Sequence, residues 1–260
     1  WNKFINNIII MPKIPTFTSQ QQMTTESSSV VSDLKISPSN NIFTATQPLQ
    51  KYLVNEYVKE FVNEYVEIDW ENYVCLVHDP RNKEMQTYTV DFLQNVSGGP
   101  PVIYLNIGIE AMKNITKNIL IDGVPVWMGC DVGKQMERKR GLWDANLFEY
   151  ENLYGVDFGM SKADRLRYSQ TMMTHAMLFT GVDLIDGRPR RWRVENSWGA
   201  EDSGEKGFYT MNDNWFDEYM FEIASPKSYL TDDMLKALET EPIVLPAWDP
   251  MGSLAKESLS

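Results

Sequence analysis

Apolar residues recur every three or four positions in several stretches after residue 47, which is the spacing of one helix face. Ser161 and Thr231 stand immediately before two of these stretches, and both residue types are favoured helix N-caps. The pattern predicts helices at 48–66, 109–120, 162–169 and 231–238, and a helical turn at 213–219.

Shorter apolar or alternating runs predict strands between these helices. They lie at 73–77, 87–92, 124–130, 175–184, 190–197 and 206–211. Asp186-Gly187 and Pro189 mark 183–190 as a hairpin connection between two long runs. The segment 241–250 contains three prolines and cannot form a regular helix. Helices combined with mainly antiparallel late strands predict an α+β fold.

Residues 1–46 differ in composition from the rest of the chain. Ser, Thr, Gln and Asn dominate there, so the stretch buries too little apolar surface to offset the entropy lost on ordering. Its short run Ile8–Met11 is not long enough for the apolar core of a secretory signal. We expect a disordered or artefactual leader at 1–46, a globular segment at 47–256 and a C-terminal extension at 257–260.

Composition narrows the function classes. The 260 residues carry 24 Lys and Arg against 36 Asp and Glu, and this net charge of −12 gives no support for a nucleic-acid partner. No apolar run reaches the ~20 residues that a membrane-spanning helix needs. The two cysteines, Cys75 and Cys130, cannot build a disulfide framework or a zinc site of four thiolates. We expect a reducing, cytoplasmic compartment, with no metal and no cofactor.

His175 and Asn196 are the strongest candidates for chemistry. His78, the other histidine, precedes Asp79-Pro80 and is expected on the surface or in a turn. The hairpin would bring His175, at the start of one strand, beside Asn196, at the end of the next. The Asn oxygen could then accept a hydrogen bond from one ring nitrogen and leave the other for a nucleophile, with Trp198 lying over that bond. A His–Asn pair buried for structural reasons would produce the same pattern.

Four motifs, in order along the chain, resemble the bleomycin hydrolase branch of the papain-like cysteine peptidases. They are Pro125–Lys134, Met173–Met177, Trp192–Gly199 and Glu241–Gly252, and the likeness runs from about residue 47 to about 256. The resemblance implies a papain-like fold, here mainly the antiparallel β-rich lobe with surrounding helices. It also implies an aminopeptidase with a Cys–His–Asn mechanism, in which His175 is the base and Asn196 orients it.

The nucleophile of that family has no counterpart in this chain. In papain-like enzymes it lies near the N-terminus of the peptidase, in a Gln…Gly-x-Cys-Trp-like setting. Cys75 instead lies in an apolar run, and Asp131 beside Cys130 would raise the pKa of that thiol. We expect both cysteines to be small buried hydrophobes. Residues 47–256 therefore resemble the C-terminal half of the enzyme.

Two hypotheses follow. In the first, the chain belongs to a longer aminopeptidase that acts on peptide or aminoacyl amide substrates and, by resemblance, forms a homohexamer. In the second, it is an inactive truncated paralogue that serves as an assembly partner of the full enzyme. The upstream nucleotide sequence separates them, because only the first needs an in-frame exon for Gln…Cys-Trp. A minor third hypothesis makes residues 1–45 a regulatory arm.

Three further segments have two interpretations each. Trp127 could line a side-chain pocket of the cleft or simply pack in the core. Lys162, Arg165 and Arg167 are expected on a solvated helix face, with a subunit contact as the alternative. By resemblance, the tail from Trp248 through Ala255 would lie in the cleft, where a terminal carboxylate can receive the amino group of the substrate; a solvated tail is the alternative.

Overall fold

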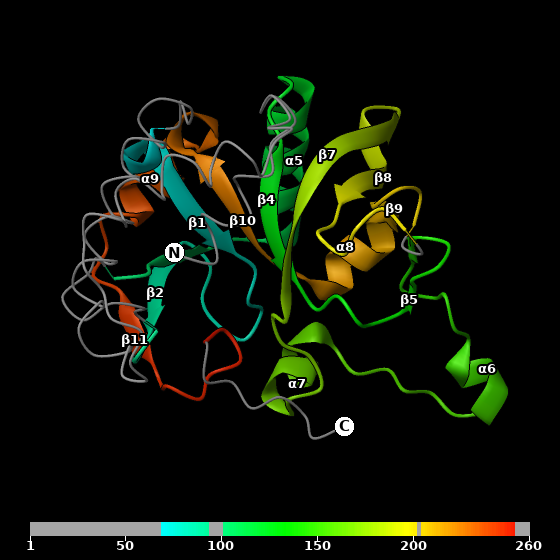
Figure 1. Ribbon diagram of the computed structural model, residues 1–260. Coiled ribbons are helices and arrows are strands. Elements are labelled where there is room, and N and C mark those ends of the chain that lie inside the picture. Colours follow the sequence, from blue (N-terminus) through cyan, green and yellow to red (C-terminus); the bar gives the residue numbers. More distant parts are fainter. Residues whose placement is uncertain (1–68, 94–100, 202–203, 253–260) are drawn as a thin grey trace, which may run out of the picture. The chain divides into compact units, whose positions relative to one another are not determined.

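The computed structural model describes residues 69–93, 101–201 and 204–252 (Figure 1). From Glu71 onward these residues belong to one structural unit. The helix predicted at 48–66, the leader 1–46 and the extension 257–260 lie outside the described residues.

The described strands form a mixed sheet in the order β11-β2-β3-β1-β10-β4-β7-β8-β9-β6-β5. Neighbours are mainly antiparallel, but β1–β3, β11–β2 and β6–β9 are parallel pairs. The strands are β1 (Tyr73–Val77), β2 (Gln86–Val90), β3 (Tyr104–Asn106), β4 (Val126–Cys130), β5 (Met136–Glu137), β6 (Leu142–Trp143), β7 (His175–Ile185), β8 (Arg188–Glu195), β9 (Phe208–Asn212), β10 (Met220–Pro226) and β11 (Ile243–Leu245).

The described residues also form helices, most of them short. They are η1 (Trp70–Asn72), α5 (Ile109–Ile121), α6 (Tyr150–Tyr154), α7 (Lys162–Arg167), α8 (Asp213–Tyr219), η2 (Lys227–Tyr229) and α9 (Asp232–Ala237). Both predicted N-caps are present: Ser161 Oγ accepts the Asp164 N–H at 3.1 Å, and Thr231 Oγ1 accepts the Met234 N–H at 3.3 Å. The expected α+β architecture is confirmed, with α5 lying along strands β4, β7 and β10 (Figure 1).

The hairpin between β7 and β8 is tighter than the sequence predicts. The strands continue to Ile185 and restart at Arg188, so two residues form the turn instead of the predicted connection 183–190. Asp186 and Gly187 both have positive φ angles, 51° and 75°. A two-residue turn of this kind matches the twist of the flanking strands and favours Asp-Gly. The turn thus fixes the register that brings the far ends of β7 and β8 together.

The core lies on the two faces of the sheet. The larger apolar cluster contains the buried face of α5, alternate residues of β4, β7 and β8, and the α8 aromatics Trp215 and Phe216. A smaller cluster on the other face joins Val77, Leu166 of α7 and Phe221 to Met251 near the end of the described chain. Met173, two residues before His175, packs against this second cluster.

The helix α7 corrects one expectation. Lys162 is buried, not solvated, and its Nζ donates to the main-chain oxygens of Asp217 at 3.0 Å and Met220 at 2.5 Å. Arg165 donates to the Glu218 main-chain oxygen and pairs with its carboxylate, while Arg167 remains exposed. Lys162 and Arg165 therefore donate hydrogen bonds to carbonyl groups at the C-terminal end of α8, which carry partial negative charge. Burial lowers the pKa of Lys162 to about 7.

Candidate active site

His175 and Asn196 lie at the same end of the β7–β8 hairpin. His175 is the first residue of β7, and Asn196 directly follows β8, in which Glu195 pairs with Leu178. His175 Nε2 is 2.9 Å from Asn196 Oδ1, and Asn196 is 8 % exposed. The hydrogen bond that the sequence predicts is therefore present, in a largely buried setting.

A main-chain donor fixes the orientation of the Asn196 amide. The Ser197 N–H donates to Asn196 Oδ1 at 2.8 Å, and a flipped amide would place its NH₂ group against this donor. Asn196 Oδ1 is thus an acceptor, and His175 Nε2 must carry the proton of their shared hydrogen bond. Among the described residues, Nδ1 of His175 has no hydrogen-bond partner. The ring is held as the Nε2–H tautomer, and Nδ1 is left to exchange a proton with another group.

Trp198 covers the imidazole, as the sequence predicts. The ring centroids of Trp198 and His175 are 5.1 Å apart, with an angle of 31° between their planes. The Arg138 guanidinium lies 4.8 Å from the centroid of the Trp198 ring, and Tyr209 meets that ring edge-on. These contacts hold the indole in place and keep water away from the His175–Asn196 hydrogen bond.

A buried carboxylate holds the turn that leads into β7. Asp131, at the end of β4, accepts hydrogen bonds from Thr171 Oγ1 at 2.8 Å, and from the Met172 N–H and Thr174 Oγ1 at 3.4 Å each. The Thr174 N–H also donates to the Cys130 main-chain oxygen at 2.9 Å. Burial raises the pKa of Asp131, and the hydrogen bonds from Thr171 and its neighbours oppose that rise. Asp131 therefore fixes the backbone immediately before His175.

Asp131→Ala is expected to lower the free energy of unfolding by about 2–3 kcal/mol, because it leaves the Thr171 hydroxyl and the Met172 N–H buried without an acceptor. Urea denaturation followed by tryptophan fluorescence measures the change. Asp183→Ala is the control, since Asp183 on β7 forms an exposed pair with Arg190 on β8 and its loss should cost less than about 1 kcal/mol. Equal losses in the two variants would contradict this role of Asp131.

The two thiols lie in environments that disfavour a reactive thiolate. Cys130 is directly opposite His175 in the β4–β7 register, but its side chain is fully buried in the larger core cluster. Burial raises the pKa of Cys130 well above its ordinary value, and Asp131 adds to the rise, as the sequence predicts. Burial and the Glu222 carboxylate raise the pKa of Cys75 in the same way. A thiol kept protonated is a poor nucleophile.

The remaining candidates are Trp127, Trp248 and Ala255. Trp127 is half-buried and pairs with Leu178, so it points to the sheet face opposite Met128 and Met177. Trp248 is 75 % exposed, and Ala255 lies outside the described residues. A position in a substrate cleft stays a prediction for all three.

His78 lies between β1 and the turn at Pro80 and Arg81, which fits the second of its two expected positions. It is half-buried, and its Nδ1 lies 3.0 Å from the Ile107 main-chain oxygen. Burial, with the nearby charge of Lys162, lowers the pKa of His78 to about 4. His78 is therefore a neutral structural residue at neutral pH.

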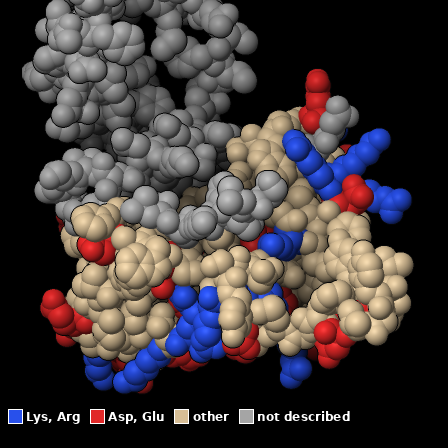
Figure 2. All heavy atoms as spheres, turned by 90° about the horizontal axis from the view of Figure 1, so that it is seen from below, with Lys and Arg blue, Asp and Glu red and all other residues tan. Residues whose placement is uncertain are grey.

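In the described part of the chain, metal-ligand groups and surface charge do not point to a second catalytic site. Within 69–93, 101–201 and 204–252, no group of three or more His, Cys, Asp or Glu side chains could hold a metal ion. No helix in the same ranges is long and apolar enough to cross a bilayer. Seen from below, Lys and Arg side chains lie among Asp and Glu side chains with wide uncharged areas between them (Figure 2).

Sequence reasoning missed the groups that fix the orientation of the pair. The role of Ser197 is carried by its main-chain N–H, which leaves no trace in residue type. From the sequence, Asp131 is recognisable only as a charge beside Cys130. The sequence did hold a signal for the hydrogen-bond partners of Asp131. It is the pair of threonines before His175, Thr171 and Thr174.

A His–Asn pair at one end of an antiparallel hairpin, with an indole over the imidazole, is the arrangement of the papain-like cysteine peptidases. The chain belongs to the Peptidase C1-like family, whose profile matches residues 19–252. The match begins inside the predicted leader 1–46, whose boundary stays a prediction.

Curated relatives and a solved structure agree with this assignment. The chain is 46 % identical to bleomycin hydrolase of Gallus gallus over 220 residues, which are 82 % of this chain and 46 % of the relative. It is 42 % identical to aminopeptidase C of Listeria innocua over 199 residues, 76 % of this chain and 45 % of that protein. A crystal structure of PepW from Lactobacillus rhamnosis superposes with a TM-score of 0.72 at 40 % identity, covering 75 % of this chain and 45 % of that one. The chain thus spans about half the length of the relatives it matches.

Proposed function

We propose that this chain provides the His–Asn half of a cysteine aminopeptidase that releases N-terminal amino acids from peptides and aminoacyl amides. The observation that carries the proposal is the 2.9 Å hydrogen bond from His175 Nε2 to Asn196 Oδ1, which leaves Nδ1 available. The similarity to bleomycin hydrolase and aminopeptidase C supports the substrate class. The nucleophilic thiol comes from a segment outside residues 1–260, because both thiols of this chain lie in environments that disfavour a thiolate.

The mechanism follows from the tautomer. The nucleophilic thiol transfers its proton to Nδ1 of His175, and the resulting thiolate attacks the carbonyl carbon of the scissile bond. The imidazolium then gives a proton to the leaving amine, and a water molecule hydrolyses the thioester, which restores the thiol. Asn196 accepts from Nε2 throughout and keeps the ring aimed at the reacting atoms. Trp198 shields that hydrogen bond from water.

The remaining features of the enzyme are part of the same proposal. The C-terminal tail receives the amino group of the substrate, and the complete protein forms a homohexamer in the cytoplasm. The unpaired state of Cys75 and Cys130 supports a reducing compartment. A second candidate is an inactive assembly partner, with which the raised pKa values of Cys75 and Cys130 are equally consistent. It differs from the first in one respect, since no thiol then joins His175.

Nitrogen-15 NMR of the histidine rings tests the site directly. The chain has two histidines, so labelled histidine gives two sets of ring signals, and His78→Gln assigns them. We expect the neutral His175 ring to be the Nε2–H tautomer in the unchanged chain and a mixture of tautomers in Asn196→Ala. Asn152→Ala, which removes an exposed asparagine bonded to Glu149, is the control and should leave the ring signals unchanged. An Nδ1–H tautomer in the unchanged chain would rule out the proposed role of His175.

A further inference from the structure

The segment from Phe148 to Gly159, which contains α6, projects from the rest of the described chain as an arm (Figure 1). Every residue of the arm is exposed, and α6 has no buried side chain. Its large apolar side chains are between 41 % and 73 % exposed; they are Phe148, Tyr150, Leu153, Tyr154, Val156 and Phe158. A soluble protein seldom exposes this many neighbouring apolar side chains except where a partner binds.

Hydrogen bonds join the arm to the rest of the described chain only at its two ends. Gln135 accepts the Phe148 N–H at 2.9 Å at one end, and Arg165 donates to the Met160 main-chain oxygen at 2.7 Å at the other. The bonds between these ends join arm residues to one another. The helix α6 has five residues, and isolated helices shorter than ~12–15 residues are marginal in water. We therefore expect the arm to rest against another surface.

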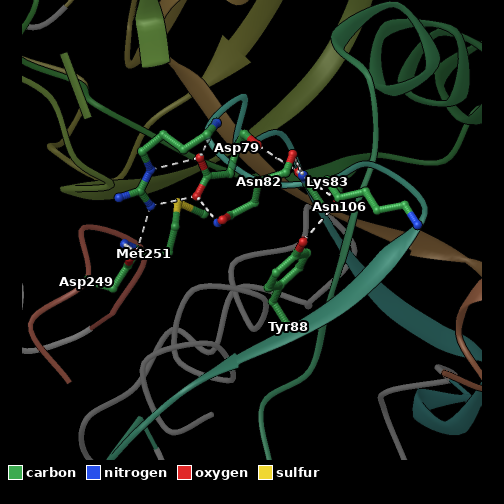
Figure 3. A network of polar contacts seen from close by, with 8 residues as sticks. Asp79, Asn82, Lys83, Tyr88, Asn106, Asp249 and Met251 are labelled. Atoms are coloured by element: carbon green, nitrogen blue, oxygen red, sulfur yellow. Dashed lines mark hydrogen bonds and ion pairs between the residues drawn. The ribbon is translucent and has the colours of Figure 1, made fainter. Parts of the chain in front are cut away.

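The loop after β11 shows how a surface segment can instead be held within one copy of the chain. Asp249 accepts a hydrogen bond from Arg81 at 2.9 Å, and Arg81 also pairs with Asp79 at 2.6 Å (Figure 3). The Asn106 side chain donates to the Asp79 main-chain oxygen at 3.0 Å, and Met251 of the loop is buried in the smaller apolar cluster. This loop has its partners inside the chain, whereas the arm has neither ionic nor apolar cover of this kind among the described residues.

A hollow of about 830 Å³ separates the arm from α7 and α8, and we call it the arm groove. Four aromatic rings of the arm line it, together with Tyr219 of α8. Glu149 and Glu151 also line it, and neither forms an ion pair with a described residue. Arg165 is the one Lys or Arg side chain in the described lining, and it already pairs with Glu218. An aromatic, acidic groove suits guanidinium groups, which stack on rings and pair with carboxylates.

The tip of the β7–β8 hairpin has the complementary character. Arg188, Arg190, Arg191 and Arg193 lie along β8, and all four are exposed. Strand β9 pairs with β8 only from Arg191 onward, so Arg188 and Arg190 lie on a two-stranded tip beyond β9. Ile185, opposite Arg188 at this tip, is 50 % exposed. Within the described ranges, only Arg190 of the four arginines is in an ion pair. The tip therefore offers unpaired guanidinium groups beside an apolar side chain.

One copy of the chain does not bring these two surfaces together. The β7–β8 turn lies at the top of the view and α6 near the bottom right (Figure 1). A partner that fits the arm groove is therefore a second copy of the chain, which supplies its own arginine-bearing tip.

We propose that the tip of the β7–β8 hairpin of one copy docks in the arm groove of a second copy. The contact is head-to-tail, because its two surfaces differ, and its repetition closes a ring or extends a chain of subunits. The same hairpin carries His175 at its other end, so the contact braces the strands that hold the His175–Asn196 pair. The inference rests on the homohexamer in the proposed function and names the surfaces that join its subunits.

Sedimentation velocity of the 260-residue chain measures the contact. The unchanged chain is expected to form assemblies larger than a monomer, and added salt should dissociate them. Arg188→Glu places a negative charge on the tip, and Tyr154→Lys places a positive charge in the arm groove. Each should weaken association by about tenfold or more, because like charges then face each other. Lys236→Glu reverses an exposed charge on α9 and is the control, with no change in association expected.

A mixture of the two variants identifies the surfaces. The Tyr154→Lys chain keeps an intact tip, and the Arg188→Glu chain keeps an intact arm groove. Together they are expected to form a dimer of one chain of each kind and nothing larger, because each has one working surface. The appearance of this dimer also shows that both variants are folded.

Three outcomes would overturn the proposal. A monomeric unchanged chain would leave the arm groove to a segment outside residues 1–260. Association that survived both substitutions would assign the assembly to other surfaces, and so would a mixture without the mixed dimer. The proposed chemistry fails separately, because an Nδ1–H tautomer of His175 contradicts it whatever the state of association.

Discussion

Residues 1–260 expressed alone are expected to hydrolyse no aminoacyl amide substrate above the uncatalysed rate. His175 and Asn196 are in place, but the nucleophile of the proposed mechanism is not supplied by either thiol. Removing the nucleophile from a hydrolase of the triad type costs about 10⁶ in kcat, so the expected effect is close to total. Release of a fluorescent amine from an aminoacyl-coumarin amide measures it, with chicken bleomycin hydrolase as the positive control.

Two variants make this expectation decisive. Cys130 is the more informative thiol, because its backbone lies opposite His175 while its side chain has no exposed surface. Turnover that persisted in both Cys130→Ser and Cys75→Ser would be assigned to a contaminating enzyme. Turnover that one of these substitutions abolished would instead identify the nucleophile within the chain. It would also require the core around that thiol to open.

The hairpin that carries the site could be predicted from the sequence because its signals are local. Long alternating runs and the Asp186-Gly187 turn determine which ends of β7 and β8 meet, and that alone places His175 beside Asn196. The tautomer could not be predicted this way, because it depends on the main-chain N–H of Ser197. The cations of α7 were misjudged for a related reason, since their partners are main-chain oxygens about 55 residues away.

Strand β10 shows the other limit of sequence analysis. It lies between β1 and β4 and is buried along most of its length, yet it was not predicted. Glu222 interrupts its apolar run, and a charged residue at that position argues against a central strand. Strand β3, on the far side of β1, is only three residues long and too short to give a periodic signal. In β10, therefore, tertiary packing buries a carboxyl group that the local sequence pattern would place at the surface.

The burial of Glu222 has a measurable thermodynamic consequence. Its side chain is 4 % exposed, and burial raises the pKa of Glu222 from 4.5 to about 7, although a hydrogen bond with Cys75 partly opposes the rise. The folded state therefore binds more protons than the unfolded state between pH 4.5 and 7. By linkage, the free energy of unfolding keeps its full value below pH 4.5, where Glu222 is protonated in both states. It falls as the pH rises through about 7, where the buried carboxyl must ionise. The difference in pKa corresponds to about 3 kcal/mol.

Glu222→Gln is accordingly expected to stabilise the chain by about 3 kcal/mol at pH 8 and to change its stability little near pH 4.5. Glutamine has nearly the same shape and can still accept a hydrogen bond from Cys75, but it never ionises. Urea denaturation of both proteins from pH 4.5 to 8 gives the difference in unfolding free energy, which cancels the titration of all other groups. Glu239→Gln, at an exposed position, is the control and should give a difference that stays flat with pH. A flat difference for Glu222→Gln as well would mean that water or a rearranged neighbour solvates the carboxylate in the folded state.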